Sequence, residues 1–255
     1  SIGSYNNVNL EALTILFMIL ASLPFVLYLK AIRGKPKDLI RDQQVQGFFK
    51  ILVISILIVV FYLFLTSNFT FSEILRYSLF NVTSILTGTG FTSTNYNDWG
   101  TPIILLFLFI TFIGGCAGST TCGVKIFRLQ IVFNNSKEMI SKLISPNRVV
   151  NKRYNGEHLS PEITQSVITF LFIFILTFIV LSILLSFTGL DLLTAFSAAA
   201  TSISNVGPGL GQVIGPAYSF SQIPEIAKWL LSFGMLAGRL EFLTLIVIFN
   251  KSFWR

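Results

Sequence analysis

The chain has 255 residues and a net charge of +7, but only 11% of its residues are charged and 53% are hydrophobic. An average soluble domain has about a quarter of its residues charged, so this composition excludes an ordinary soluble protein. The positions of the positive charges, described below, explain them better than a nucleic-acid partner does. We therefore predict an all-α integral membrane protein that is surrounded by membrane lipid.

Five apolar segments have about the 20 residues that a helix needs to cross a bilayer. We expect spanning helices at residues 10–29, 48–65, 102–122, 167–187 and 226–249. Two shorter segments, 71–86 and 190–203, lie between the second and third and between the fourth and fifth of these. Irregular backbone survives at membrane depth only where protein buries it or where it lines a wet cavity. We therefore expect the two short helices to be re-entrant and to lead into a pore.

Each re-entrant helix is followed by small, uncharged residues that could form an ion filter. Thr87, Gly88, Thr89, Gly90 and Phe91 follow the first helix, and Ser204, Asn205, Val206, Gly207 and Pro208 follow the second. Such residues allow the chain to turn its carbonyl oxygens toward one axis, as in the filters that replace the hydration shell of potassium. The sequence thus predicts two copies of a helix, re-entrant helix, filter and helix unit.

The basic residues mark the sidedness of the chain. All of the 18 Lys and Arg residues except Arg76, Lys228 and Arg239 lie at residues 30–50, at 125–153 or at the end of the chain. Basic connections are typical of the cytoplasmic side, which places both filters on the outer side of a cell membrane. We expect 125–162 to be a polar cytoplasmic loop, serving either as a docking surface or as a segment solvated by water and lipid headgroups.

The third expected span is interrupted at residues 114–123 by glycines, hydroxyl side chains and two cysteines. Each glycine costs about 1 kcal/mol in a helix interior, so we expect the helix to break here. One interpretation is close helix packing through Gly114 and Gly118. The other is a gate loop inside the membrane, with candidate residues Gly114, Gly115, Gly118, Ser119, Thr120, Gly123 and Lys125.

Arg239 is a lone cation deep in the last apolar segment. A guanidinium at that depth costs from about 3 to more than 10 kcal/mol if it faces lipid, so it has to face water or a partner. Glu241, two residues later, projects from another face of the helix and is a poor partner. Two interpretations remain open: a positive charge on the pore axis that forms part of the gate, or one half of a buried ion pair with another helix.

Together these motifs resemble the Trk/Ktr/HKT superfamily of potassium transporters, and most closely its TrkH-type pore subunit. Residues 87–91 are similar to its third filter, 205–211 to its fourth filter, 114–125 to its intramembrane loop and 238–241 to its final motif. The resemblance divides the chain into three parts. These are the last helix of a preceding repeat with its cytoplasmic connection (1–45), the third pore repeat (46–160) and the fourth pore repeat (161–255).

The resemblance implies potassium uptake through a selectivity filter, with potassium at the filter carbonyls, no cofactor, and gating by the intramembrane loop and the pore-facing Arg239. It also implies a bacterial inner-membrane location and a homodimer of complete subunits. The implied partner is a cytoplasmic nucleotide-binding regulatory protein, which we expect to dock on the basic connections at 30–50 and 125–153.

The sequence departs from the family pattern because it holds two filter segments where family members carry four. We therefore expect a missing amino-terminal half or a second chain that supplies the rest. The alternatives are a non-conducting remnant or scaffold half of a split transporter, and a pore that does not discriminate sodium from potassium. We do not expect an enzyme, because the sequence has no metal-ligand cluster and no nucleophile beside a base.

Overall fold

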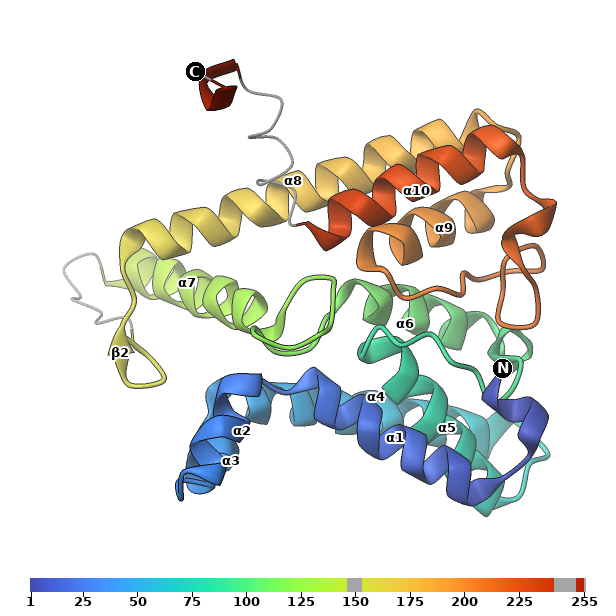
Figure 1. Cartoon of the computed structure of the whole chain (residues 1–255), viewed down its shortest axis with the longest axis horizontal. Coiled ribbons are helices and arrows are strands. Elements are labelled where there is room, and N and C mark those ends of the chain that lie inside the picture. Colours follow the sequence, from blue (N-terminus) through green and yellow to red (C-terminus); the bar gives the residue numbers. More distant parts are fainter. Residues whose placement is uncertain (146–152, 241–250, 255) are drawn as a thin grey trace.

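The computed structural model describes residues 1–145, 153–240 and 251–254, and most of its regular structure is helical (Figure 1). This confirms the predicted all-α class. The α-helices are α1 (Val8–Ser22), α2 (Phe25–Ile32), α3 (Lys37–Arg41), α4 (Gln43–Thr66), α5 (Phe71–Leu86), α6 (Thr101–Phe112), α7 (Ile126–Ile144), α8 (Pro161–Ser186), α9 (Leu192–Ser204) and α10 (Glu225–Arg239). The short elements are the 3-10 helices η1 (Ile2–Tyr5), η2 (Tyr96–Trp99), η3 (Phe220–Gln222) and η4 (Lys251–Trp254), and the antiparallel strands β1 (Arg153–Tyr154) and β2 (Glu157–His158).

The helices α4 and α8 are the longest apolar elements. α4 has 24 residues and α8 has 26, so at about 1.5 Å per residue each is longer than the roughly 30 Å hydrocarbon core of a bilayer. Among the described residues, length and composition allow these two helices to cross a membrane, and α1 with α2 makes a third if the pair is counted as one span. The expected five spans are therefore only partly present as continuous helices.

The first expected span, 10–29, is divided at Pro24. α1 ends at Ser22, α2 begins at Phe25, and the two helices are bent by 95°. Leu23 is extended, with φ −91° and ψ 157°, as the residue before a proline tends to be. Proline also lacks the amide hydrogen that would continue the helix. The single span that we expected at 10–29 is therefore two helices, and backbone groups at the bend are left without partners in their own helices.

The two short helices lie where the sequence predicts them. α5 has 16 residues and α9 has 13, too few to cross a bilayer. A capping box starts α5: the Thr70 hydroxyl accepts from the Glu73 amide, and the Glu73 carboxylate accepts from the Thr70 amide. Asp191 caps α9 by accepting from the Thr194 amide. Local capping therefore fixes where each short helix begins.

The third expected span, 102–122, is wrong beyond Phe112, where α6 ends. The break that we predicted within 114–123 is present, and the loop that fills it runs to Lys125, the residue before α7. A second difference is α7 itself, because we expected residues 125–162 to be a loop. Ile126 and Ile131 of α7 are buried, and α7 packs on α4 and α8. An apolar face thus folds much of this segment onto the membrane helices.

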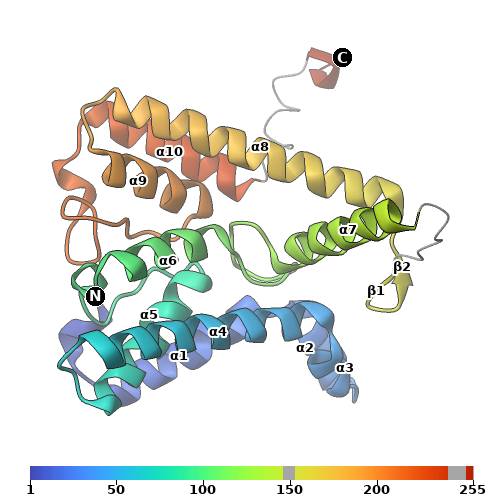
Figure 2. The same ribbon diagram turned by 180° about the vertical axis from the view of Figure 1, so that it is seen from behind.

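The helices form two groups with α6 between them (Figures 1 and 2). One group holds α1, α4 and α5, and its hydrophobic cluster also includes Val206 and Leu210 from the segment after α9. The other group holds α8, α9 and α10, and Phe112 of α6 packs against its cluster. The segments that follow α5 and α9 therefore lie where the two groups meet. The rest of the expected last span, 241–249, lies outside the described residues, as does 146–152.

Candidate filter and gate

The segment after α5 is turned by two glycines. Gly88 and Gly90 have φ of 65° and 75°, a region that glycine adopts at little cost. The amides of this turn point back to the helix: those of Thr89 and Gly90 donate to the Ser84 carbonyl at 2.9 and 3.3 Å, and that of Gly88 donates to the Ile85 carbonyl at 3.0 Å. The end of α5 therefore satisfies the N–H groups of residues 87–90 and leaves the carbonyl oxygens of the segment for other partners.

The segment after α9 has the same construction. Asn205 and Gly207 have φ of 52° and 118°. The Val206 amide donates to the Thr201 carbonyl at 3.1 Å, and the Gly207 amide donates to the Thr201 hydroxyl at 2.9 Å. The Asn205 side chain also donates to the Met235 carbonyl of α10 at 3.0 Å, which fixes the segment to the last helix.

The two segments lie against each other. A Cβ atom built on Gly88 would be 3.9 Å from the Ser204 carbonyl oxygen, and one built on Gly90 would overlap the Val206 carbonyl oxygen. No hydrogen bond from another described residue reaches the carbonyl oxygens of 87–91 or 204–208. These oxygens form a set of acceptors that the described protein leaves open, on segments that are buried at Thr87, Ser204 and Val206 and half-buried or exposed elsewhere.

Side chains hold the outer end of each segment. Asn81 of α5 donates to the Ser93 hydroxyl at 2.8 Å and accepts from the Ser93 amide at 3.2 Å. Ser197 of α9 accepts from the Leu210 amide at 3.0 Å and donates to the Leu210 carbonyl at 3.2 Å. In both units, a side chain of the short helix thus holds a residue just beyond the filter segment: Ser93 in the first unit and Leu210 in the second.

Backbone hydrogen bonds join the two ends of the loop between α6 and α7. The Gly114 amide donates to the Val124 carbonyl at 2.9 Å, and the Val124 amide donates to the Phe112 carbonyl at 2.8 Å. A Cβ on Gly114 would overlap the Cys122 carbonyl, whereas one on Gly118 would have no atom within 4 Å. Gly118, which has a φ of 74°, therefore serves a turn, and the open space where its side chain would lie does not fit the packing interpretation.

The loop is seated in the break between α1 and α2. The Cys116 amide donates to the Ser22 carbonyl at 3.0 Å, the Thr120 amide donates to the Ala21 carbonyl at 3.3 Å, and the Phe25 amide donates to the Gly118 carbonyl at 3.0 Å. Helix ends leave such backbone groups without partners in their own helix. The bend at Pro24 and the loop therefore satisfy each other's backbone.

A glutamine holds the same loop from another helix. Gln44, in the first turn of α4, accepts from the Ala117 amide through its side-chain oxygen at 2.8 Å. The sequence analysis did not single out Gln44, because nothing in the local pattern distinguishes it from the neighbouring Gln43. Its role depends on a contact with a distant part of the chain.

Arg239 at the end of α10 also reaches this loop. Its Nη1 donates to the Thr120 carbonyl at 3.1 Å and lies 2.9 Å from the Cys122 sulfur. Within the described part of the chain, these two contacts are with neutral atoms. The structure brings Arg239 together with the predicted loop residues Thr120 and Gly123.

A small polar cavity of about 150 Å³ separates Arg239 from α7 and α8. It is lined by loop residues together with three cationic side chains, those of Lys125, Arg128 and Arg239. Arg128 also lies over the ring of Phe170, with its guanidinium carbon 3.7 Å from the ring centre. The positive charge of Arg239 therefore borders this cavity. The described residues contain no group of three His, Cys, Asp or Glu side chains that could hold a metal ion.

The outer loops of the two units are joined by Asn97, which the sequence analysis also missed. Its side chain donates to the Gly211 carbonyl at 2.8 Å and accepts from the Gly211 amide at 3.3 Å. Asn97 stands beside Asn95 and Asp98 in the sequence, and nothing in this local pattern indicates which of them has a distant partner.

Two short helices, each followed by a glycine-turned segment, on a largely helical scaffold with helices of membrane-spanning length are the arrangement expected of a membrane transport protein. The sequence matches the TrkH family, described as a cation transport protein, over residues 1–255, and the chain belongs to that family. It is 45% identical over 240 residues to the Trk system potassium uptake protein TrkI of Halomonas elongata, and 33% identical over 261 residues to the Trk system potassium uptake protein TrkH of Vibrio parahaemolyticus. These alignments cover 94% and 100% of this chain.

The fold agrees with a solved structure. The crystal structure of the potassium transporter TrkH from Vibrio parahaemolyticus matches all of this chain with a TM-score of 0.93 at 32% identity. The chain spans about half the length of these relatives: 49% of TrkI, 53% of the TrkH sequence and 55% of the crystallised chain.

Proposed function

We propose that this chain takes part in potassium uptake across the bacterial inner membrane, with residues 87–91 and 204–208 supplying filter carbonyls. The observation that carries this proposal is the pair of glycine-turned segments in contact, whose carbonyl oxygens accept no hydrogen bond from the described residues. Rings of backbone carbonyls can replace the hydration shell of potassium. The names of the relatives, which are potassium uptake proteins, support the choice of ion.

The conducting assembly contains this chain together with two further pore repeats. Two filter segments can contribute to two sides of a coordination ring but cannot surround an ion. The amino-terminal half or a second chain supplies the other two sides, and complete subunits pair as a homodimer. The length relation to the relatives is consistent with this assembly, because the chain covers 53% of TrkH.

The membrane potential provides the driving force in this proposal. A potential of about 100 mV, negative inside, is worth about 2.3 kcal/mol for each monovalent cation. At about 1.4 kcal/mol for each factor of ten, this energy corresponds to roughly a 50-fold accumulation. A selective pore can therefore concentrate potassium without a coupled reaction.

The loop at 114–125 and Arg239 form the gate of this pore. Gly114, Gly115, Gly118, Ser119, Thr120, Gly123 and Lys125 shape the loop, and the charge of Arg239 opposes cation passage beside it. The hydrogen bonds of Arg239 to the loop at 3.1 and 2.9 Å support a shared role. A cytoplasmic nucleotide-binding protein that docks on the basic segments 30–50 and 125–153 would move the helices that hold the loop.

Rubidium uptake into liposomes tests the function. The chain alone, and the chain assembled with two further pore repeats, are reconstituted and given an inside-negative potential. We expect flux from the assembly, suppressed by external potassium but not by sodium, and none from the chain alone. Robust selective flux from the isolated chain would contradict the assembly. A silent assembly would favour a non-conducting scaffold, and equal competition by sodium would favour a non-selective pore.

A further inference from the structure

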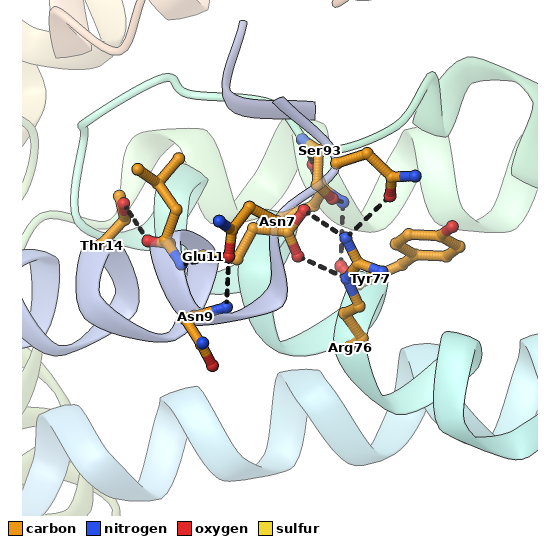
Figure 3. A network of polar contacts seen from close by, with 10 residues as sticks. Asn7, Asn9, Glu11, Thr14, Arg76, Tyr77 and Ser93 are labelled. Carbon is orange, nitrogen blue, oxygen red and sulfur yellow. Dashed lines mark hydrogen bonds and ion pairs between the residues drawn. The ribbon is translucent and has the colours of Figure 1, made fainter. Parts of the chain in front are cut away.

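An ion pair joins the outer end of the re-entrant helix α5 to α1. Arg76 of α5 donates from Nε to Glu11 Oε2 at 2.7 Å and from Nη2 to Glu11 Oε1 at 2.9 Å (Figure 3). Its Nη2 also donates to the Asn6 side-chain oxygen at 3.3 Å. The Glu11 side chain is 3% exposed and that of Arg76 is 21% exposed. This two-pronged contact fixes both the distance and the relative orientation of the two helices.

The same two elements hold the chain that leaves the segment at 87–91. From one side, Asn81 of α5 binds Ser93 through two hydrogen bonds. From the other side, the residues before α1 bind Thr92: the Gly3 amide donates to the Thr92 carbonyl at 3.1 Å, and the Thr92 amide donates to the Ser1 hydroxyl at 2.8 Å. The position of Thr92 and Ser93 therefore depends on how α5 and the start of α1 are placed relative to each other.

We propose that Glu11 and Arg76 are positioning residues that set the geometry of the filter segment 87–91, and thereby its discrimination between potassium and sodium. Neither residue touches the filter. The ion pair completes a closed series of contacts. The series runs from Arg76 along α5 to Asn81 and Ser93. It then returns from Thr92 through residues 1–6 to Glu11. The filter segment lies between Leu86 and Thr92, so both of its ends are held by this series of contacts.

An ion pair between Glu11 and Arg76 is better suited to orienting the two helices than to stabilising the fold. A buried pair gives little net stability over an apolar contact of the same size, but it accepts only one arrangement of its partners. Filter carbonyls distinguish two ions through their spacing or their dipole field. A small rotation of α5 would therefore change selectivity before it changed the fold.

The test compares permeability ratios for rubidium and sodium in the complete assembly, and it rests on the proposed function. Glu11→Gln keeps the side-chain shape and removes the charge. We expect its rubidium-to-sodium ratio to fall about tenfold, which corresponds to about 1.4 kcal/mol of lost discrimination. The charge swap Glu11→Arg with Arg76→Glu should recover most of the ratio. Glu225→Gln removes an exposed carboxylate from the first turn of α10, and it should leave the ratio unchanged.

A second variant covers the case in which Glu11→Gln fails to fold. Asn6 has a positive φ of 41°, so Asn6→Gly keeps the backbone conformation and removes one contact of Arg76 without leaving a buried charge unpaired. A lowered ratio in this variant supports the proposal, and an unchanged ratio overturns it. The proposal is also overturned if Glu11→Gln assembles normally with the wild-type ratio, or if the swap restores assembly but not selectivity. A wild-type assembly that carries no rubidium would instead contradict the proposed function itself.

Discussion

Gly90 and Gly207 hold corresponding places in the two filter segments, but the structure predicts unequal effects when they are replaced by alanine. At Gly90 the added Cβ meets two costs: the residue has a φ of 75°, and the Cβ would overlap the Val206 carbonyl oxygen. At Gly207 the φ is 118°, but no atom lies within 4 Å of the added Cβ. Only the first substitution pushes one filter segment away from the other.

The expected magnitudes follow from these environments. The left-handed conformation costs a non-glycine residue about 1–2 kcal/mol. Overpacking adds about 1–3 kcal/mol, so Gly90→Ala should cost roughly 2–5 kcal/mol and Gly207→Ala about 1–2 kcal/mol. In Gly90→Ala the Val206 carbonyl has to move to relieve the overlap with the added Cβ. Gly90→Ala should therefore also lose more potassium selectivity than Gly207→Ala.

Two measurements on the complete assembly check this prediction: the melting temperature in detergent and the rubidium-to-sodium permeability ratio. Gly189→Ala is the matched control, since Gly189 has a φ of 88° with no atom within 4 Å and lies outside both filter segments. It should lose about as much stability as Gly207→Ala and keep the wild-type ratio. Equal effects at Gly90 and Gly207, or a larger effect at Gly207, would refute the reasoning from the Val206 contact.

Three further substitutions test the gate and the contact between the two units. Arg239→Ala removes hydrogen bonds to neutral atoms, so stability should fall by only about 1 kcal/mol while rubidium flux rises; Arg239→Lys, which keeps the charge, should keep the flux low. Gln44→Ala should loosen the loop at Ala117 by about 1 kcal/mol and raise basal flux about fivefold, whereas Gln43→Ala should not. Asn97→Ala leaves the backbone of Gly211 without its partner and should cost about 1–3 kcal/mol in thermal unfolding.

Each of these predictions has a result that contradicts it. A large loss of stability in Arg239→Ala with no gain in flux would mean that the residue is a brace. Unchanged flux in Gln44→Ala would remove Gln44 from the gate. For Asn97, a melting temperature of Asn97→Ala equal to that of the wild type would show that the two hydrogen bonds to Gly211 contribute little.

The sequence by itself determined the features that depend on local composition. Helix α5 lies at 71–86 as predicted, because a capping box begins it and glycines end it. The break after α6 was predictable, because glycines and hydroxyl residues disfavour a helix in any surroundings. Arg239 stood out for a similar reason, since a cation in an apolar segment needs water or a partner wherever that segment lies.

Local signals were less informative where packing competes with them. A proline disfavours a continuous helix at Pro24, but the 95° bend between α1 and α2 exists together with the loop that satisfies the carbonyls of Ala21 and Ser22. Residues 126–144 looked like part of a polar loop, yet the apolar side chains among them are enough to place α7 against α4 and α8. In both cases the conformation follows from what the neighbouring elements offer.

Only the tertiary structure decided which distant residues meet. Glu11 with Arg76, Gln44 with Ala117, and Asn97 with Gly211 join segments that are far apart in the chain. A single sequence shows the donors and acceptors but not their partners, because many pairings have equal chemistry. Folding selects among them by bringing whole helices together, and the helices do so through apolar burial and backbone capping. The polar pairs then fix the orientation that this packing has made possible.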